Sequence, residues 1–528
     1  MGDIITGLLY GTIADAKSRL KSNWPAISDL SGSTTPGRFE AEAGKLIVHG
    51  QIPHKIDGTF YRVSPDRYLH KAKSIPIDGD GSISAFRIHE GHIDFKMKYI
   101  KTEKLRLEIR AGKSFFGAFQ NPWDRHPCIR AAIDSSANTN VIYWAGRLLA
   151  LEETANPYQI DPDTLDTTGY DPFYDQVKSK SFSAHPKVDP FTEELVTFGY
   201  AAKGTGSDDV VTWSVGKDGN KTQELWVKQP FPTLIHDCGI TENFIILMSW
   251  PFGHDIERMK KGEHHWMFRP DRPAPFVVVP RTPASPPAGW KQGESRVYYW
   301  HNCVNVHSAG AWEENGKLYI EASRVQGNVF PFFPDPEGNV PFSAPRADFV
   351  RWEIDPTKPS ESWLGDPEVV IDIPSEFPRL DERFMTKKYK IIFMAVYLQP
   401  DDTSSDNVFQ GLNALAMINK QTGKTQYFYP GDHATVQEPT FIPRSDDSPE
   451  GDGWIMSVVD RSDARGTELV FIDTKDFTKP IAIAELPFHV KSQIHGNWID
   501  TKELGQRKPL TYFPEEVKLF GKGPLERL

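Results

Sequence analysis

Residues 298–316 read Tyr298-Tyr299-Trp300-His301-Asn302-Cys303-Val304-Asn305-Val306-His307-Ser308-Ala309-Gly310-Ala311-Trp312-Glu313-Glu314-Asn315-Gly316. The first part is aromatic and rich in valine, as β-strands are, and small residues follow His307. We therefore expect the strand to end at His307 and a polar turn to begin there. A histidine in such a place can reach an axis or a pocket without burying an unpaired ring nitrogen.

Three other histidines lie in comparable settings: His185, His236 and His495. The four are separated by 51 (236−185), 71 (307−236) and 188 (495−307) residues, which match no local metal motif. The chain has 16 histidines. The alternative to a shared metal site is therefore that the four are unrelated turn residues, each hydrogen bonded to the backbone. If the four converge, their imidazoles suit divalent iron, copper, zinc or nickel and leave positions for further ligands.

A histidine ligand needs an acceptor for its second ring N–H, and that acceptor is often a carboxylate. Three glutamates stand in apolar or proline-flanked stretches and are candidates for this role: Glu153, Glu376 and Glu438. Each can also be read as a solvated loop acid.

Composition restricts the class of protein. A net charge of −11 over 528 residues argues against a nucleic-acid partner. Three widely spaced cysteines, Cys128, Cys238 and Cys303, form no disulfide framework, and we expect them to be small buried residues of a cytoplasmic protein. No apolar run approaches the ~20 residues of a membrane-spanning helix. Residues 1–6 fit an N-myristoylation pattern, with the start of an amphipathic helix as the alternative.

From about residue 45 the chain reads as short strands between turn residues, with 40 glycines and 42 prolines. The predicted strands include residues 141–144, 148–151, 195–200, 210–215, 244–250, 276–279, 317–322, 391–397, 454–459, 468–472 and 481–485. Helix is predicted only within a partly helical N-terminal extension, 1–44, and at 255–261. We therefore expect one all-β domain over 1–528. A propeller is the best candidate because radial repetition hides sheet edges, although no repeated motif is visible.

Several motifs resemble those of the carotenoid cleavage oxygenases, in particular the stilbene-cleaving branch with fungal and bacterial members. They are IDGTFYRVSP at 56–65, DGDGSISAF at 78–86, AHPKVDP at 184–190 and HGNW at 495–498. The resemblance covers nearly the whole chain from residue 48. It implies a seven-bladed β-propeller with a cap of loops and helix over an axial iron(II).

The resemblance assigns the iron ligands to His185, His236, His307 and His495. It pairs Glu153 with His236, Glu376 with His307 and Glu438 with His495. The family pattern HxxNAxE selects His307 over the runner-up His301, but this chain has Gly310 where the pattern has asparagine.

The implied reaction is scission of a conjugated carbon–carbon double bond with O2, which gives two carbonyl products. Stilbene-cleaving relatives hold the substrate phenol with a tyrosine and a lysine, and those positions fall on Phe119 and Glu152 here. Without that pair, either Glu152 accepts a bond from a neutral phenol or the substrate is more apolar. The two substrate classes are an aryl-alkene (stilbenoid or phenylpropenoid) and an apocarotenoid or torulene-type polyene.

A polyene lives in a membrane, so peripheral membrane contact calls for an exposed apolar patch. The candidates are Phe330, Phe332, Phe333 and the 250–252 turn, with a loop packed over the propeller as the alternative. Two other functions are weaker. A non-catalytic binding propeller would not need four histidines and three glutamates, and a calcium-dependent hydrolase would use oxygen ligands. The sequence defines no oligomeric state.

Overall fold

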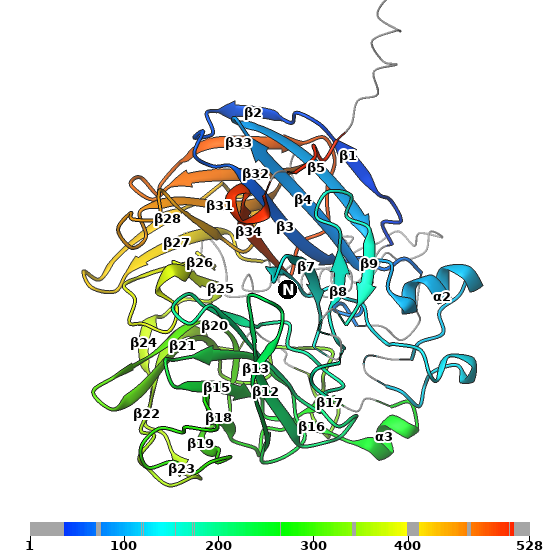
Figure 1. The fold of residues 1–528 in the computed structure, drawn as a ribbon, viewed down its shortest axis with the longest axis vertical. Coiled ribbons are helices and arrows are strands. Elements are labelled where there is room, and N and C mark those ends of the chain that lie inside the picture. Colours follow the sequence, from blue (N-terminus) through cyan, green and yellow to red (C-terminus); the bar gives the residue numbers. More distant parts are fainter. Residues whose placement is uncertain are drawn as a thin grey trace, which may run out of the picture.

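Seven β-sheets are arranged around a common centre (Figure 1). The structure, a computed structural model, describes residues 36–69, 75–117, 119, 121–153, 155–171, 173, 175–263, 266–340, 345–398, 411–461, 466–505 and 507–511. Six of the sheets have four or five strands and one has six, so the predicted seven-bladed all-β propeller is confirmed.

The strands of each blade are given in spatial order. The first blade contains β1 (Ala41–Ala43), β5 (His92–Tyr99), β4 (Gly81–His89), β3 (Gly58–Pro65) and β34 (His495–Asp500), and the second contains β6 (Asn140–Trp144), β7 (Arg147–Leu151), β8 (Tyr158–Ile160) and β9 (Thr167–Tyr170). The third contains β10 (Lys187–Asp189), β11 (Glu194–Gly199), β12 (Asp209–Gly216) and β13 (Lys221–Lys228).

The fourth blade contains β14 (Ile235–Ile240), β15 (Phe244–Ser249), β18 (Ala274–Pro280), β19 (Arg296–Trp300) and β23 (Ser362–Trp363). The fifth contains β20 (Val304–Glu314), β21 (Lys317–Val325), β22 (Ala347–Ile354) and β24 (Glu368–Ile371). A separate hairpin pairs β16 (Phe252–His254) with β17 (Trp266–Phe268).

The sixth blade contains β25 (Ser375–Leu380), β26 (Ile391–Val396), β27 (Ala414–Asn419) and β28 (Lys424–Phe428). The seventh contains β29 (Ala434–Val436), β31 (Gly453–Arg461), β32 (Gly466–Asp473), β33 (Pro480–Leu486) and β2 (Ile47–Gly50), and β30 (Thr440–Pro443) also pairs with β31. The helices among the described residues are α2 (Glu103–Ala111), α3 (Ile256–Lys260) and α4 (Thr501–Leu504), with 3-10 turns η1 (Pro127–Ile129) and η2 (Glu382–Phe384).

Two pairings between the ends of the chain close the ring. The C-terminal strand β34 completes the first blade beside β3, and the N-terminal strand β2 completes the last blade beside β33. Closure of this kind completes the radial arrangement, which leaves only short, protected sheet edges. It also brings His495, the first residue of β34, to the inner end of a blade built mainly from residues before 100.

The core lies between adjacent blades. Strands β15, β18 and β26 are buried along their whole length because neighbouring sheets cover both of their faces. Between the fourth and fifth blades, for example, the rings of Phe276 and Trp352 lie 5.1 Å apart. This double coverage explains why the predicted strands read as continuous apolar runs, and each of them is present in the structure.

Of the predicted helices, only the second can be compared. Helix α3 matches the prediction at 255–261, with the Asp255 carboxylate accepting the Arg258 backbone N–H at 3.0 Å. Most of the predicted 1–44 extension, including the myristoylation pattern, lies outside the described residues. Its last residues form β1, which pairs with β5 at the edge of the first blade.

Helix α2 was not predicted. Its sequence alternates charged and apolar residues, a strand-like period, and Ile109 is 42% exposed. Polar contacts hold it instead. The Thr102 hydroxyl caps Leu105 N–H at 3.2 Å, and buried Lys104 donates to Asp80 at 2.6 Å.

The cysteine prediction is partly wrong. All three cysteines are free and Cys238 and Cys303 are buried, but Cys128 is exposed. It belongs to the 3-10 turn η1 in a loop, where the His126 ring lies 2.8 Å from its sulfur. In the part of the chain that the structure describes, no helix is long and apolar enough to cross a membrane.

Candidate metal centre

His236 and His307 lie in the inner strands of two neighbouring blades, β14 and β20, which pack against each other. In both strands the ladder is irregular at the histidine, because regular pairing stops between Ile235 and Cys238 and between Asn305 and Ser308. An irregularity of this kind redirects a side chain that regular alternation would place between blades. It turns both rings toward the centre of the propeller.

The prediction that the strand ends at His307 is wrong. Strand β20 continues to Glu314, and the turn is formed by Asn315 and Gly316, both with positive φ. The small residues after His307 reflect tight packing rather than a turn. A Cβ atom on Gly310 would lie 2.6 Å from Leu380 Cδ2 and 2.9 Å from Tyr389 Cε1. The residues around Gly310 therefore leave no room for a side chain, which explains why glycine stands here in place of the family asparagine.

We predict that Gly310→Asn destabilises the fold by about 1–3 kcal/mol, since overpacking a closed core forces its neighbours to move. Thermal denaturation followed by circular dichroism measures the effect. Gly316→Asn is the matched control, because a Cβ atom there meets nothing within 4 Å, although its φ of 74° adds a small cost that asparagine tolerates. Equal melting temperatures for the two variants would contradict the packing argument.

The other two histidines come from the third and first blades. His185 lies two residues before β10 and His495 begins β34. One ring nitrogen from each of His185, His236, His307 and His495 lies within 4.8 Å of the other three, and all four residues are buried or nearly so. The predicted runner-up His301 is exposed and does not belong to the cluster of four, and its ring lies 5.7 Å from that of Trp363 at the edge of a blade.

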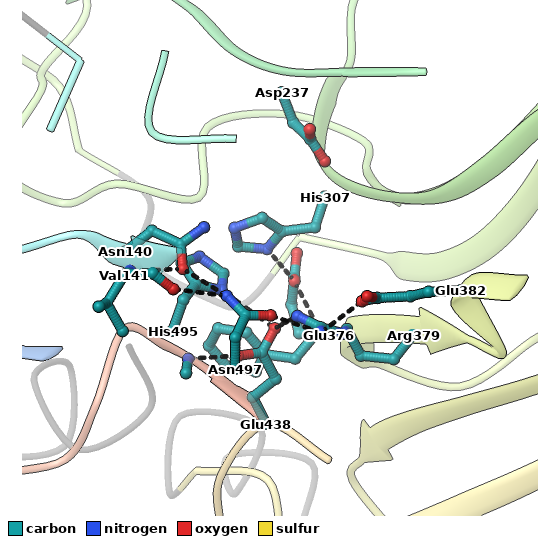
Figure 2. Close-up of polar contacts among 12 residues, drawn as sticks. Asn140, Val141, Asp237, His307, Glu376, Arg379, Glu382, Glu438, His495 and Asn497 are labelled. Atoms are coloured by element: carbon teal, nitrogen blue, oxygen red, sulfur yellow. Dashed lines mark hydrogen bonds and ion pairs between the residues drawn. The ribbon is translucent and has the colours of Figure 1, made fainter. Parts of the chain in front are cut away.

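Each candidate glutamate lies behind one histidine, in the pairs that the family resemblance implies. Glu376 accepts a hydrogen bond from His307 Nδ1 at 2.5 Å, and Glu438 accepts one from His495 Nδ1 at 3.1 Å (Figure 2). Glu153 pairs with His236 Nδ1. Such a carboxylate fixes the tautomer so that Nε2 carries the free lone pair.

Further donors hold these carboxylates in place. The Tyr200 hydroxyl donates to Glu153 at 2.7 Å, and the Gly496 N–H and the Arg379 guanidinium donate to Glu438 at 2.9 and 3.3 Å. His495 and Arg379 outweigh the effect of burial and lower the pKa of Glu438 to about 2. The carboxylate therefore stays charged at any physiological pH. Neither Tyr200 nor Arg379 was predicted, because nothing local in the sequence links them to a histidine.

The residues fit a bound divalent metal ion. Among the described residues, His185 Nε2 and His495 Nε2 are buried and have no hydrogen-bond partner, and His236 Nε2 lies only 3.0 Å from His307 Nε2. Burial and the neighbouring imidazoles hold the pKa of His185 well below its usual range, and burial lowers that of His495 to about 4. Both rings are thus neutral donors, and a shared cation would satisfy all four lone pairs.

Two cavities of similar volume, about 90 and 110 Å³, reach the histidines, and their linings differ. The first touches His236 and His307 and has mainly apolar walls: Ile77, Phe119, Leu234, Trp250, Phe330, Phe333 and Ile494. The second touches His185, His307 and His495 and is more polar than the first. Asn140, Lys187, Asp237, Arg379, Glu382 and Asn497 lie in its wall beside apolar residues such as Ile142, Phe377 and Leu380. An apolar organic substrate fits the first cavity better than the second.

The predicted substrate residues Phe119 and Glu152 both line the apolar cavity. Phe119 packs 6.1 Å from Phe333. Glu152 is buried, and its Oε2 accepts hydrogen bonds from Ser136 N at 2.7 Å and Ser136 Oγ at 2.6 Å. The cavity therefore combines apolar walls with two firmly held carboxylates, because Glu153, which pairs with His236, also lies in its wall.

The expected exposed apolar patch is not present. Phe330, Phe333, Trp250 and Phe252 are all buried and Phe332 is partly buried. Trp250 and Phe330 lie 5.2 Å apart, and Phe252 and Phe333 lie 5.8 Å apart. Trp250, Phe330 and Phe333 lie in the wall of the cavity, so the alternative of a loop packed over the propeller describes this region.

A seven-bladed propeller with four histidines at its centre and glutamates behind three of them defines a class of all-histidine, non-haem metal proteins. Comparison with known proteins gives the family. The family model described as retinal pigment epithelial membrane protein matches residues 34–500. The chain therefore belongs to that family, the carotenoid cleavage oxygenases that its motifs resemble.

Individual relatives cover nearly the whole chain. Resveratrol cleavage oxygenase 1 of Botryotinia fuckeliana is 55% identical over 96% of this chain and 92% of its own. Carotenoid cleavage oxygenase 1 of Neurospora crassa is 37% identical over 91% and 92%. The crystal structure of Pseudomonas brassicacearum lignostilbene dioxygenase superposes with a TM-score of 0.83 at 34% identity, over 91% of this chain and all of the other.

Proposed function

We propose that the protein is a non-haem iron(II) dioxygenase that cleaves a conjugated carbon–carbon double bond with O2 to give two carbonyl products. The observation that carries this proposal is the cluster of four histidine rings, which the apolar cavity reaches. The substrate is a small hydrophobic alkene. The names of the relatives, which are oxygenases that cleave resveratrol, lignostilbene or carotenoids, support the reaction class.

The iron would be held by one ring nitrogen each of His185, His236, His307 and His495, and Glu153, Glu376 and Glu438 would orient three of these rings. When bound, iron(II) would supply the activation of O2 that scission of the double bond requires. Four neutral ligands would leave coordination positions free, as an oxygenase needs.

The protein's own residues would position the alkene and exclude water. Trp250, Phe330 and Phe333 pack closely at the cavity wall and would hold a flat conjugated substrate against the histidines. In the overall reaction the double bond breaks and each of its carbons takes one oxygen atom of O2. No net proton transfer occurs, so the reaction needs no general acid or base from the protein.

We propose an aryl-alkene with a free phenol as the substrate class. Glu152 is the reason, because a buried carboxylate in an apolar cavity is a hydrogen-bond acceptor that a neutral phenol O–H can satisfy. The resveratrol and lignostilbene named for the relatives are phenolic aryl-alkenes. Phe119 would contact the aromatic ring rather than the phenol oxygen.

A polyene such as an apocarotenoid or torulene is the second candidate. It is supported by the carotenoid cleavage named for the Neurospora relative and by the loss of a hydroxyl at Phe119. A non-catalytic binding propeller is disfavoured because the chain keeps four clustered histidines and their glutamates. A calcium-dependent hydrolase is disfavoured because calcium takes oxygen ligands.

An aerobic assay of the iron-loaded protein tests the proposal, with products identified by mass spectrometry. The substrates are resveratrol, its fully methylated ether, isoeugenol and a long apocarotenal. We expect aldehydes from resveratrol and isoeugenol that carry oxygen from ¹⁸O2. Cleavage of the apocarotenal alone would favour the second candidate, and O2-independent binding without product from any substrate would reject the enzyme.

A cytoplasmic location is also part of the proposal. It is supported by the three free cysteines, which are typical of a reducing compartment. Contact with a membrane would be required only if the substrate is a polyene.

A further inference from the structure

His185 differs from the other three histidines because no carboxylate lies behind it. In the described part of the chain no side chain hydrogen bonds to its ring, whereas His236, His307 and His495 each have a glutamate. Its segment, between Ser183 and Lys187, is irregular up to the start of β10. Something other than a ring hydrogen bond must therefore hold this histidine in place.

Backbone and neighbouring contacts supply that support. Asn140 Nδ2 donates to the carbonyl of Ala184, the residue before His185, at 2.8 Å. On the other side, the Lys187 ammonium pairs with Asp237 at 2.8 Å, with side chains that are 13% and 1% exposed. The His185 segment is thus fixed at both ends by buried polar groups.

Asp237 also holds the segments of two other histidines. It directly follows His236, and its Oδ2 accepts hydrogen bonds from the N–H and the hydroxyl of Ser308, the residue after His307, at 2.7 and 2.9 Å. Figure 2 shows Asp237 beside His307. Its other oxygen accepts from Cys238 N–H at 2.7 Å and pairs with Lys187. The Asp237 carboxylate therefore connects three blades. The residues that it links lie one or two positions from three candidate ligands, His185, His236 and His307.

The ladder irregularities make this contact necessary. Residues 236–237 and 306–307 lie where regular strand pairing is interrupted, so the ladder itself does not fix the two histidine backbones. A buried carboxylate with four donors restores the missing constraints. Because the donors come from three different segments, a shift of Asp237 moves three rings relative to one another.

We propose that Asp237, through Lys187 and Ser308, is a positioning residue that sets the geometry of the metal centre, and that for His185 it replaces the missing carboxylate partner. The proposal rests on the metal centre of the proposed function but not on the identity of the alkene. Asp237 is not one of the clustered candidate ligands and would act through the segments that carry them.

The test uses cobalt(II) loaded into the full-length protein, because its visible d–d absorption reports ligand geometry. We expect Asp237→Asn to shift these bands and to accelerate cobalt release to a chelator by about 10- to 100-fold. Ser308→Ala removes the hydroxyl contacts with Asp237 and the Cys238 carbonyl but keeps the N–H contact with Asp237, and it should give a smaller change in the same direction. The double variant Asp237→Asn/Lys187→Met removes both charges. It shows whether the changes in the cobalt bands and release rate come from leaving the Lys187 charge without its partner.

Asp348→Asn is the matched control, because Asp348 is equally buried and pairs with Arg324 at 2.6 Å but lines neither cavity. It should lower the melting temperature without changing the cobalt bands or the release rate. If Asp237→Asn and Ser308→Ala behave like Asp348→Asn, Asp237 is merely structural and the proposal is overturned. A wild-type protein that binds no cobalt or iron would instead overturn the metal centre itself.

Discussion

His236→Ala is expected to lose its metal on desalting, whereas His301→Ala retains it. The truncation removes one of four converging ring nitrogens and leaves the Glu153 carboxylate in the site without its histidine partner. Loss of a carboxylate behind a ligand typically weakens metal binding by about 10- to 100-fold, so loss of the ligand itself should cost at least about 100-fold.

The comparison with His301 makes the result specific. His301 lies close in sequence to His307 and was the alternative ligand, but it is exposed, and its ring lies 5.7 Å from that of Trp363. Metal content measured by mass spectrometry after reconstitution with iron(II), together with a melting curve for each variant, decides the matter. Full iron occupancy in His236→Ala, with the fold intact, would remove His236 from the ligand set.

The strands could be predicted from the sequence because the blades cover both faces of each strand and so require continuous Val, Ile and Phe runs. The number of blades could not be derived in this way. The blades have between four and six strands, and the β16–α3–β17 insertion separates neighbouring strands β15 and β18 of one sheet. With such unequal units no repeat is visible, and the seven blades were expected only from family motifs.

The candidate metal centre, too, could be predicted only in part from the residues themselves. The glutamate–histidine pairs join residues 83, 69 and 57 positions apart, distances over which spacing carries no information. The motifs of the family supplied those pairs. Asp237 was overlooked although it adjoins His236, because a lone aspartate beside a histidine predicts nothing until the irregular pairing of β14 and β20 is known.

The errors have a common cause. The small residues after His307 suggested a turn, but packing against Leu380 and Tyr389 explains Gly310 within a continuous strand. The aromatic residues from 330 to 333 suggested an exposed patch, but two of the three phenylalanines are buried in the cavity wall. In both cases a local pattern was satisfied by tertiary contacts that a single sequence does not reveal.

The second large effect concerns substrate choice at Glu152. We expect Glu152→Leu to lower kcat/KM for resveratrol by about 10- to 100-fold and to leave cleavage of its methyl ether nearly unchanged. A buried phenol O–H that loses its acceptor costs about 1–3 kcal/mol, whereas an ether has no hydrogen to donate. In the wild type the phenol should be preferred over the ether for the same reason.

The contrast between the two substrates separates recognition from folding. Glu152 also accepts hydrogen bonds from Ser136, and any damage to the cavity wall from their loss would slow both substrates equally, unlike the loss of a phenol contact. Glu152→Gln retains an acceptor oxygen and should lie between the wild type and Glu152→Leu. If Glu152→Leu slows both substrates alike, or the wild type favours the ether, then Glu152 does not bind the phenol. The apolar polyene would then become the better candidate, because the apolar walls of the cavity, and not Glu152, would select the substrate.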